Sequence, residues 1–439
     1  MASRVLINRP GKLTSFREAY NFAYGTYSRS TREKLLEFLA AVPGFDIKTH
    51  ENTPQIELAE MYSFMLADSI VQTARISDDA GTKALYEELK RKQARRRKSG
   101  LGRDPITVRT REGHIGQLVG DSLFLSRKWK TFHDFLLEYI VMVLGRDWFA
   151  AEVKKPAQER HQIIRLAEKV SDFQRRHIVK QGEVYSAVAT APAAAYLQIA
   201  YDLYVIKHNV GLQKFMIDRL KQIELFQGAR YELYVAASLI KGGFSVEYED
   251  EADKTRSHCE YIATHNETGK QFSVEAKSKH RHGVWGYVDD RQKNPLNLNI
   301  KRLIKDAIKK DAPHPKAIFI DVNLPAEPGE TFKKSWAQKS IALINKLESR
   351  PYAKGREAYI FLTNAPHGHC ADDEVDPGND AFMTAIGMPE FLVHDEGPVN
   401  KNHREMRRLI DFLVFHTQIP NAFDTDTVQL VALKNQAES

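Results

Sequence analysis

The chain has 439 residues, of which 42% are hydrophobic, which is long enough for two or three domains with substantial cores. Its two cysteines, Cys259 and Cys370, cannot build a disulfide framework, which favours a reducing compartment such as the cytoplasm. Lys and Arg outnumber Asp and Glu by 64 to 57, and the net charge of +7 favours a polyanionic partner. The amino terminus lacks the apolar core of a signal peptide, and no stretch is apolar enough to cross a bilayer, so we expect no membrane partner.

Residues 1–225 are expected to form a mostly helical domain with a small β insertion near 104–127. Apolar residues recur there at three- and four-residue steps, which predicts helices over Lys34–Ala41, Ile56–Ala74, Phe132–Leu144 and Ile163–Ile178. A further long helical stretch, Ala193–Leu225, is expected to break near Asn209. This half carries no catalytic motif, so substrate binding, sensing and homo-oligomer formation all remain open for it.

One basic run stands apart in the helical half. Lys90–Arg103 places many cations at the end of a predicted helix and in a loop that contains glycine. Such a run is suited to phosphate contacts, and it is equally typical of a solvated helix end. The candidate contacts are Arg95, Arg96 and Arg97.

The second half begins with a helix and three strands. Gly228–Ile240 has an apolar stripe with Glu232 at its edge, and the glycines at 242 and 243 end the helix. Phe244–Glu249 and His258–His265 are predicted strands. In Lys270–Lys279, apolar residues alternate with Ser, Glu and Lys, which predicts a half-buried strand with Glu275 and Lys277 on one face.

The turn between the last two strands decides which side chains face each other. A four-residue loop, Asn266–Gly269, places Glu260 opposite Glu275, and a divalent cation held by oxygen ligands is the obvious candidate to offset the repulsion between the facing carboxylates. A two-residue turn, Thr268–Gly269, would place Glu260 opposite Lys277 in an ordinary cross-strand salt bridge. The sequence leaves both registers open.

These residues resemble a known family. Glu232 in GARYELYVAASLIKGG, Glu260 in HCEYIA and the Glu-Ala-Lys of VEAKSK are similar to the motif of the PD-(D/E)XK nuclease superfamily, which has the restriction-endonuclease-like fold. The resemblance spans about Phe226–Pro325, in the order helix, strand, strand, strand, helix, strand. The family usually has Asp where this chain has Glu260.

The resemblance implies an α/β fold for residues 226–439, with a mixed sheet flanked by helices. It also implies a Mg²⁺-dependent endonuclease, with Mn²⁺ as a substitute and DNA as the expected partner. Glu260 and Glu275 would hold the metal, Lys277 would orient or help activate the attacking water, and Glu232 would support the metal or the water.

Downstream of the motif, cations crowd a glycine-containing turn. Lys279 and Arg281 are candidate nucleic-acid contacts, whereas core packing is the favoured role of Trp285. Helices are predicted over Ile300–Ile308, Trp336–Leu347 and Met406–Phe415, and strands over Lys316–Leu324 and Glu357–Thr363. The loop that holds His367, His369, Cys370 and Asp372 lacks a second spaced pair of ligands, so we do not predict zinc there.

Two other functions remain as alternatives. The chain could be a nucleic-acid-binding protein that keeps the nuclease fold without catalysis. It could also be a helical sensor or interaction protein in which that fold is a scaffold. Cleavage in the presence of Mg²⁺ or Mn²⁺ separates the nuclease from both.

Overall fold

The computed structural model describes residues 32–40, 58–59, 61–63, 65 and 100–423, except 104, 111–112, 181, 250–258, 290–296, 349–356, 389–390, 392–402 and 418. The chain divides into two compact units between Arg97 and Lys98. In the first unit, helix α2 (Arg32–Ala40) lies within the predicted helical region, and its Leu35 and Leu39 pack with Leu58. The basic run at Arg95, Arg96 and Arg97 lies outside the described residues.

The second unit begins with a small sheet and a group of helices. Strands β1 (Ile106–Arg109), β2 (Ile115–Val119) and β3 (Ser122–Ser126) form an antiparallel meander, so the β structure expected near 104–127 is present as three strands at the start of this unit. Helix α5 (Phe132–Leu144) has the predicted bounds, and it begins with a capping box between Thr131 and Asp134. The next helices are α6 (Arg146–Val153) and α7 (Gln162–His177).

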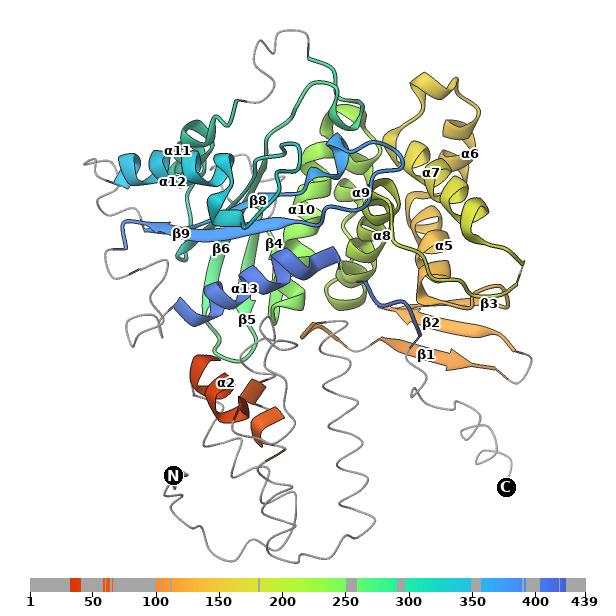
Figure 1. Ribbon diagram of the computed structural model, residues 1–439, viewed down its shortest axis with the longest axis horizontal. Helices are drawn as coiled ribbons and strands as arrows, with labels where there is room; N and C mark the ends of the chain where they lie inside the picture. Colours follow the sequence, from red (N-terminus) through yellow and green to blue (C-terminus); the bar gives the residue numbers. More distant parts are fainter. Residues whose placement is uncertain are drawn as a thin grey trace, which may run out of the picture. The chain divides into compact units, whose positions relative to one another are not determined.

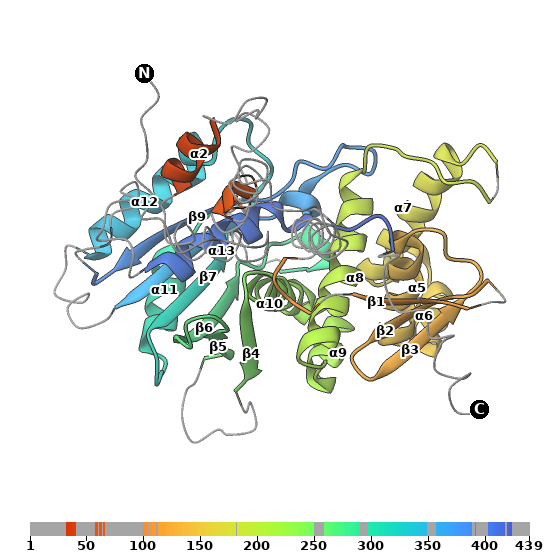
Figure 2. The same cartoon turned by 90° about the horizontal axis from the view of Figure 1, so that it is seen from below.

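Two long helices form the centre of this unit. Helix α8 (Ala191–Asn209) packs against α5, α7 and also α10 (Ile223–Lys241), and the short α9 (Lys214–Leu220) lies between α8 and α10 in the chain. The break after Asn209 was predicted. Figures 1 and 2 show α8 between helices α5 to α7 on one side and α10 on the other. α10 adjoins the large sheet. Both long helices are buried along most of their length, because partners cover them on several sides.

The large sheet is mixed, and its strands follow one another in chain order. They are β4 (Phe244–Tyr248), β5 (Tyr261–His265), β6 (Gln271–Ser278), β7 (Lys316–Asp321), β8 (Ala358–Asn364) and β9 (Asp380–Ile386). β6, β7 and β8 are parallel, and the other neighbouring pairs are antiparallel. The predicted α/β class and the mixed sheet are confirmed. The predicted set of strands did not include β9.

Helices cover both faces of this sheet (Figure 1). On one face, α10 and α13 (Arg404–Val414) share a core with Val274, Phe319 and Phe361. On the other face, α11 (Ile300–Lys309) and α12 (Ser335–Glu348) pack on Ile318 and Ile360. α11 buries its isoleucine stripe and exposes cations, as its amphipathic pattern predicted.

The expected domain boundary near Phe226 is corrected by the structure. Phe226 lies inside α10, and one hydrophobic core continues across it, from the helices α5, α7 and α8 to the large sheet. The helical part from residue 98 onward therefore belongs to the same unit as the sheet. Among the described helices, none has the length and apolar character needed to cross a membrane.

Candidate active site

The β5–β6 hairpin has the register that brings two carboxylates together. Tyr261 pairs with Val274, and the pairing continues to Thr264 and Gln271, which corresponds to the four-residue loop. Gly269 closes this loop with a φ of 69°, and its N–H donates to the carbonyl of His265 at 2.8 Å. The alternative two-residue turn is therefore excluded.

Strand β6 is more deeply buried than its alternating pattern predicted. Phe272, Val274 and Ala276 contribute to the core beneath α10, as expected for one face. Ser273 and Glu275 are also buried, and the segment after α11 contacts both: the N–H of His314 donates to Oγ of Ser273, and Nζ of Lys310 lies 2.9 Å from Oε2 of Glu275. The middle of this central strand therefore has no solvent face, whereas Lys277 and Ser278 at its end stay partly exposed, so the half-buried expectation is corrected for residues 272–276.

Four charged side chains meet on the α11 side of the sheet. Nζ of Lys277 contacts Oε1 of Glu275 and lies 3.8 Å from Oε1 of Glu260. Nζ of Lys310, the residue after α11, lies 2.9 Å from Oε2 of Glu275 and 3.5 Å from Oε1 of Glu260. We call Glu260, Glu275, Lys277 and Lys310 the acidic-pair cluster. Its lysines are partly open to solvent, with 28% of the Lys277 side chain and 21% of the Lys310 side chain exposed.

Burial dominates the electrostatics of Glu275. Its side chain is 0% exposed, and this loss of hydration raises the pKa of its carboxyl group, to which nearby Glu260 also contributes. The two ammonium groups act in the opposite direction and offset only part of this effect. Burial acts to lower the pKa of Lys310, but contact with Glu275 outweighs it and the pKa is raised. Burial likewise raises the pKa of the neighbouring Cys259 thiol, to about 12.

Glu232 is not part of this cluster. It lies on α10, which covers the opposite face of the sheet, and its carboxylate forms two short contacts, of 2.6 and 2.5 Å, with the guanidinium of Arg219 on α9. Its backbone carbonyl accepts a hydrogen bond from the Tyr261 hydroxyl. The sequence could place Glu232 at a helix edge, but it could not show which face of the sheet that helix covers.

The two predicted nucleic-acid contacts after β6 differ in their surroundings. Arg281 is only 1% exposed, and its guanidinium donates to the carbonyl of Val322 from Nε and Nη2, at 3.1 and 2.6 Å. A phosphate cannot reach a guanidinium buried in this way, so the expectation for Arg281 is corrected. Lys279 is partly exposed, and burial together with Arg281 and Arg302 lowers the pKa of its ammonium group. Cations therefore gather near the end of β6.

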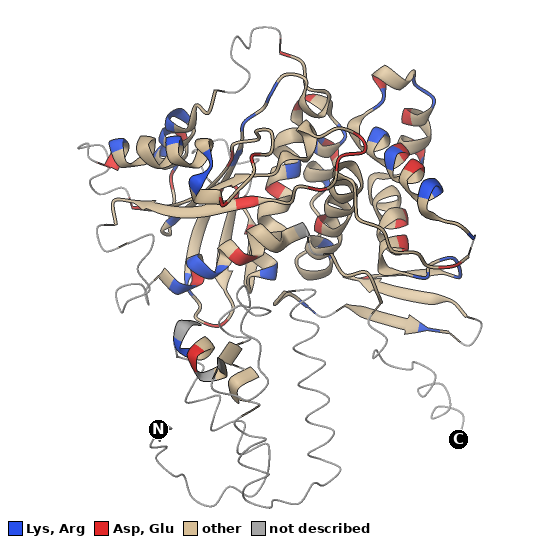
Figure 3. Cartoon of the chain, in the orientation of Figure 1, with Lys and Arg blue, Asp and Glu red and all other residues tan. Residues whose placement is uncertain are grey.

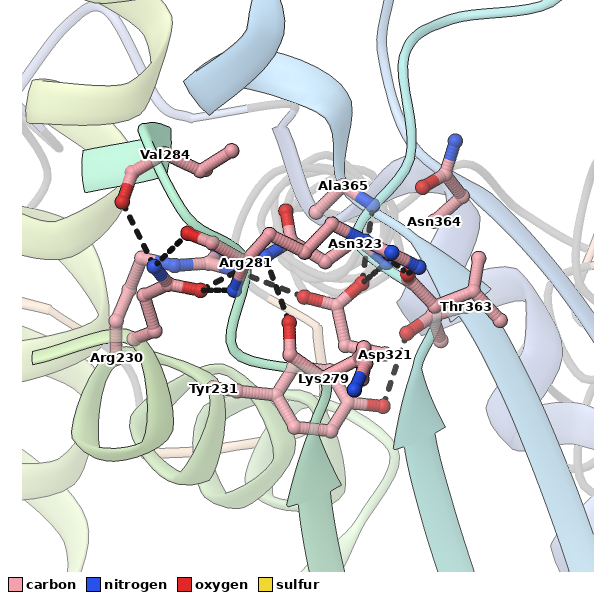
Figure 4. A network of polar contacts seen from close by, with 12 residues as sticks. Arg230, Tyr231, Lys279, Arg281, Val284, Asp321, Asn323, Thr363, Asn364 and Ala365 are labelled. Carbon is pink, nitrogen blue, oxygen red and sulfur yellow. Dashed lines mark hydrogen bonds and ion pairs between the residues drawn. The ribbon is translucent and has the colours of Figure 1, made fainter. Parts of the chain in front are cut away.

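A second polar network lies where the parallel strands β6, β7 and β8 end (Figure 4). The buried carboxylate of Asp321 pairs with Arg230 at 3.0 Å and accepts hydrogen bonds from the backbone N–H groups of Asn323 and Ala365. The side-chain amide of Asn323 donates to Gln227 and to the carbonyl of Lys279, both at 3.0 Å. We call this the strand-end network.

Several nearby residues have structural roles. Trp285 is 5% exposed and packs edge-on against Phe226, in agreement with the predicted core role. In the loop for which zinc was considered, Nε2 of His367 faces Asp376 at 2.9 Å, and Nε2 of His369 faces the carbonyl of Asn323 at the same distance.

The acidic-pair cluster has ligands of the type that Mg²⁺ uses. No group of three or more His, Cys, Asp or Glu side chains gathers within the described part of the chain. Mg²⁺, however, is commonly held by one or two carboxylates together with substrate phosphates and water. Glu260 and Glu275 meet this requirement because they already share two cationic partners. The residues present therefore fit the metal that the sequence resemblance implies.

Comparison with known proteins returned no match to a family model, to a curated protein or to a solved structure. Sequence reasoning missed Lys310. Its one sequence signal is its position directly after the amphipathic helix α11, which crosses between β6 and β7. That position became informative only once the structure showed the ammonium group of Lys310 beside Glu275.

Proposed function

We propose that this chain is a Mg²⁺-dependent nuclease that hydrolyses phosphodiester bonds, with DNA as its substrate. The observation that carries the proposal is the position of Lys277, whose ammonium group contacts Glu275 and lies near Glu260. Two carboxylates can hold a divalent cation, and a lysine beside them can stabilise the charge that develops on a phosphate during metal-assisted hydrolysis. The order α10, β4, β5, β6, α11, β7 supports the proposal, because it follows the order expected from the resemblance.

Each residue has a distinct task in this proposal. Glu260 and Glu275 would hold the divalent cation through their oxygens. The bound cation would neutralise negative charge on the phosphate and lower the pKa of a bound water. Lys277 would orient the attacking water and stabilise the charge that develops on the phosphate oxygens. Glu232, paired with Arg219 on the opposite side of the sheet, has no part in it.

The charge distribution beside the cluster suits a polyanionic substrate. Figure 3 shows Lys and Arg along α11, the helix that packs on β7 and is followed by Lys310. Lys301 and Arg302 are exposed on this helix, and Arg302 is close enough to Lys279 to affect its pKa. A basic surface next to the two carboxylates would hold the phosphate backbone and offset its repulsion from them.

The test is a cleavage assay with the full chain. Supercoiled plasmid, single-stranded DNA and RNA are each incubated with the protein in Mg²⁺, in Mn²⁺ or in excess chelator. We expect nicked and linear plasmid with either metal and intact plasmid with chelator. Binding without cleavage in all metal conditions would instead identify a non-catalytic nucleic-acid-binding protein, and neither binding nor cleavage would favour the scaffold alternative.

A further inference from the structure

Lys310 has a position that the proposed chemistry does not require. Its ammonium group lies closer to Glu275 than a loose surface ion pair would, at 2.9 Å, and it also lies 3.5 Å from Glu260. It therefore contacts the same two carboxylates as Lys277, from a different element of the fold. Because Glu275 is fully buried, an ammonium group at this position replaces hydration that the carboxylate has lost.

The number of charges in the cluster is informative. Two carboxylates face two ammonium groups, so the charges of these four side chains balance one another. A divalent cation between Glu260 and Glu275 would add two positive charges to that balance. At separations of about 4 Å, the repulsion between such a cation and an ammonium group is substantial even in a partly hydrated site. Metal binding therefore favours the departure of one lysine.

The two lysines differ in how easily they can leave. Lys277 lies on the central strand β6, two residues from Glu275, where the pleat fixes both side chains on one face. Lys310 follows the last turn of α11, where the backbone is extended, with φ of −61° and ψ of 144°. Its side chain can withdraw toward solvent without any change in the sheet. Lys310 is thus the exchangeable cation of the pair.

This inference rests on the proposed function and concerns its regulation. We infer that Lys310 is an internal counter-ion that holds Glu260 and Glu275 in the metal-free protein and competes with the divalent cation for them. The metal affinity of the chain is set in part by this competition. Lys310 acts on the metal through the carboxylates and is a positioning residue.

The test measures Mn²⁺ binding to the full chain by calorimetry, without nucleic acid. Lys310→Met removes the ammonium group and keeps the apolar stem, so Mn²⁺ should bind roughly tenfold or more tightly than to the wild-type chain. Lys310→Arg keeps the positive charge and should stay close to the wild type. Lys309→Met is the matched control, because it removes the same charge from an exposed neighbouring residue, and it should leave the affinity unchanged. Thermal melting checks that each variant folds. If Lys310→Met does not fold, Lys310→Gln serves as the second neutral variant.

The outcomes separate this inference from the proposed function. Equal or weaker Mn²⁺ binding by Lys310→Met and Lys310→Gln would overturn the counter-ion role. If Glu275→Gln abolishes Mn²⁺ binding in the same experiment, the metal site itself stands even though the role of Lys310 fails. If Glu275→Gln binds Mn²⁺ as the wild type does, the metal lies elsewhere, and both proposals fail.

Discussion

The sheet holds two groups of buried charges that are built differently. In the strand-end network, Asp321 is 0% exposed and its partners include one guanidinium and two backbone N–H groups. In the acidic-pair cluster, Glu275 is also 0% exposed, but the partners that the structure gives to its carboxylate are ammonium groups of partly exposed lysines. Burial raises the pKa of both carboxyl groups.

On our proposal, this difference separates a structural site from a site whose cations can be exchanged. The hydrogen bonds from the backbone to Asp321 fix the loops after β7 and β8, and any replacement for them would need the same geometry. Ammonium groups are point charges on flexible stems, so another cation can take their place without rearranging the backbone. The same sheet therefore combines a rigid polar frame at its strand ends with a replaceable set of cations at Glu260 and Glu275.

The largest expected effect is a loss of stability when the strand-end network is disrupted. Arg230→Met leaves the buried carboxylate of Asp321 without its charged partner, and we expect it to destabilise the chain by about 3–5 kcal/mol. Glu275→Gln, which removes a charge but keeps the shape, should change stability by no more than about 1 kcal/mol, because the relief of desolvation offsets the lost ion pairs. Urea unfolding followed by circular dichroism measures both. Equal losses in the two variants would show that both clusters are structural.

The next effect concerns buried His416, which lies in the short 3-10 helix η8 (Phe415–Thr417) after α13. Its contacts connect this segment to α8 and α10. His416 contacts Asp202 through Nε2 and Ser238 through Nδ1, and the ring of Tyr234 packs against it. Burial lowers the pKa of His416, nearby Lys241 lowers it further, and Asp202 opposes both.

A pH dependence follows from this lowered pKa. As pH falls below about 6.5, the unfolded chain takes up a proton at His416 before the folded chain does, so stability is lost. His416→Gln should flatten the slope of stability between about pH 6.5 and 5 by at most about 1.4 kcal/mol per pH unit. Urea midpoints measured across this range test it, and a slope identical to that of the wild type would show that folding does not lower the pKa of His416.

The smallest expected effect concerns the basic run outside the described residues. Replacing Arg95, Arg96 and Arg97 by Ala should weaken DNA binding and reduce its salt dependence, by a slope of about 0.9 for each phosphate that the variant no longer neutralises. Cleavage chemistry should persist at low salt, because the acidic-pair cluster is unchanged. Fluorescence anisotropy at several salt concentrations measures the slope. An unchanged slope would show that Arg95, Arg96 and Arg97 make no phosphate contacts and are only solvated.

Local patterns predicted much of the fold. The turn residues predicted the β5–β6 hairpin and narrowed its register to two choices, of which the structure has the four-residue loop, and α5 and α11 followed from their apolar periodicity. Long-range packing was not predictable in this way. The core that unites α8 with the sheet, the burial of Arg281 and the approach of Lys310 all depend on which helix covers which face. Sequence spacing along one element contains no information about that choice.

The most direct test of the central claim compares plasmid cleavage in Mn²⁺ by the wild-type chain and by Glu275→Gln, at equal concentrations of folded protein. The account predicts cleavage by the wild type, none by Glu275→Gln, and nearly equal DNA affinity for the two proteins, because the change removes a metal ligand and no phosphate contact. Cleavage by Glu275→Gln at the wild-type rate, or wild-type cleavage that persists in excess chelator, would contradict it.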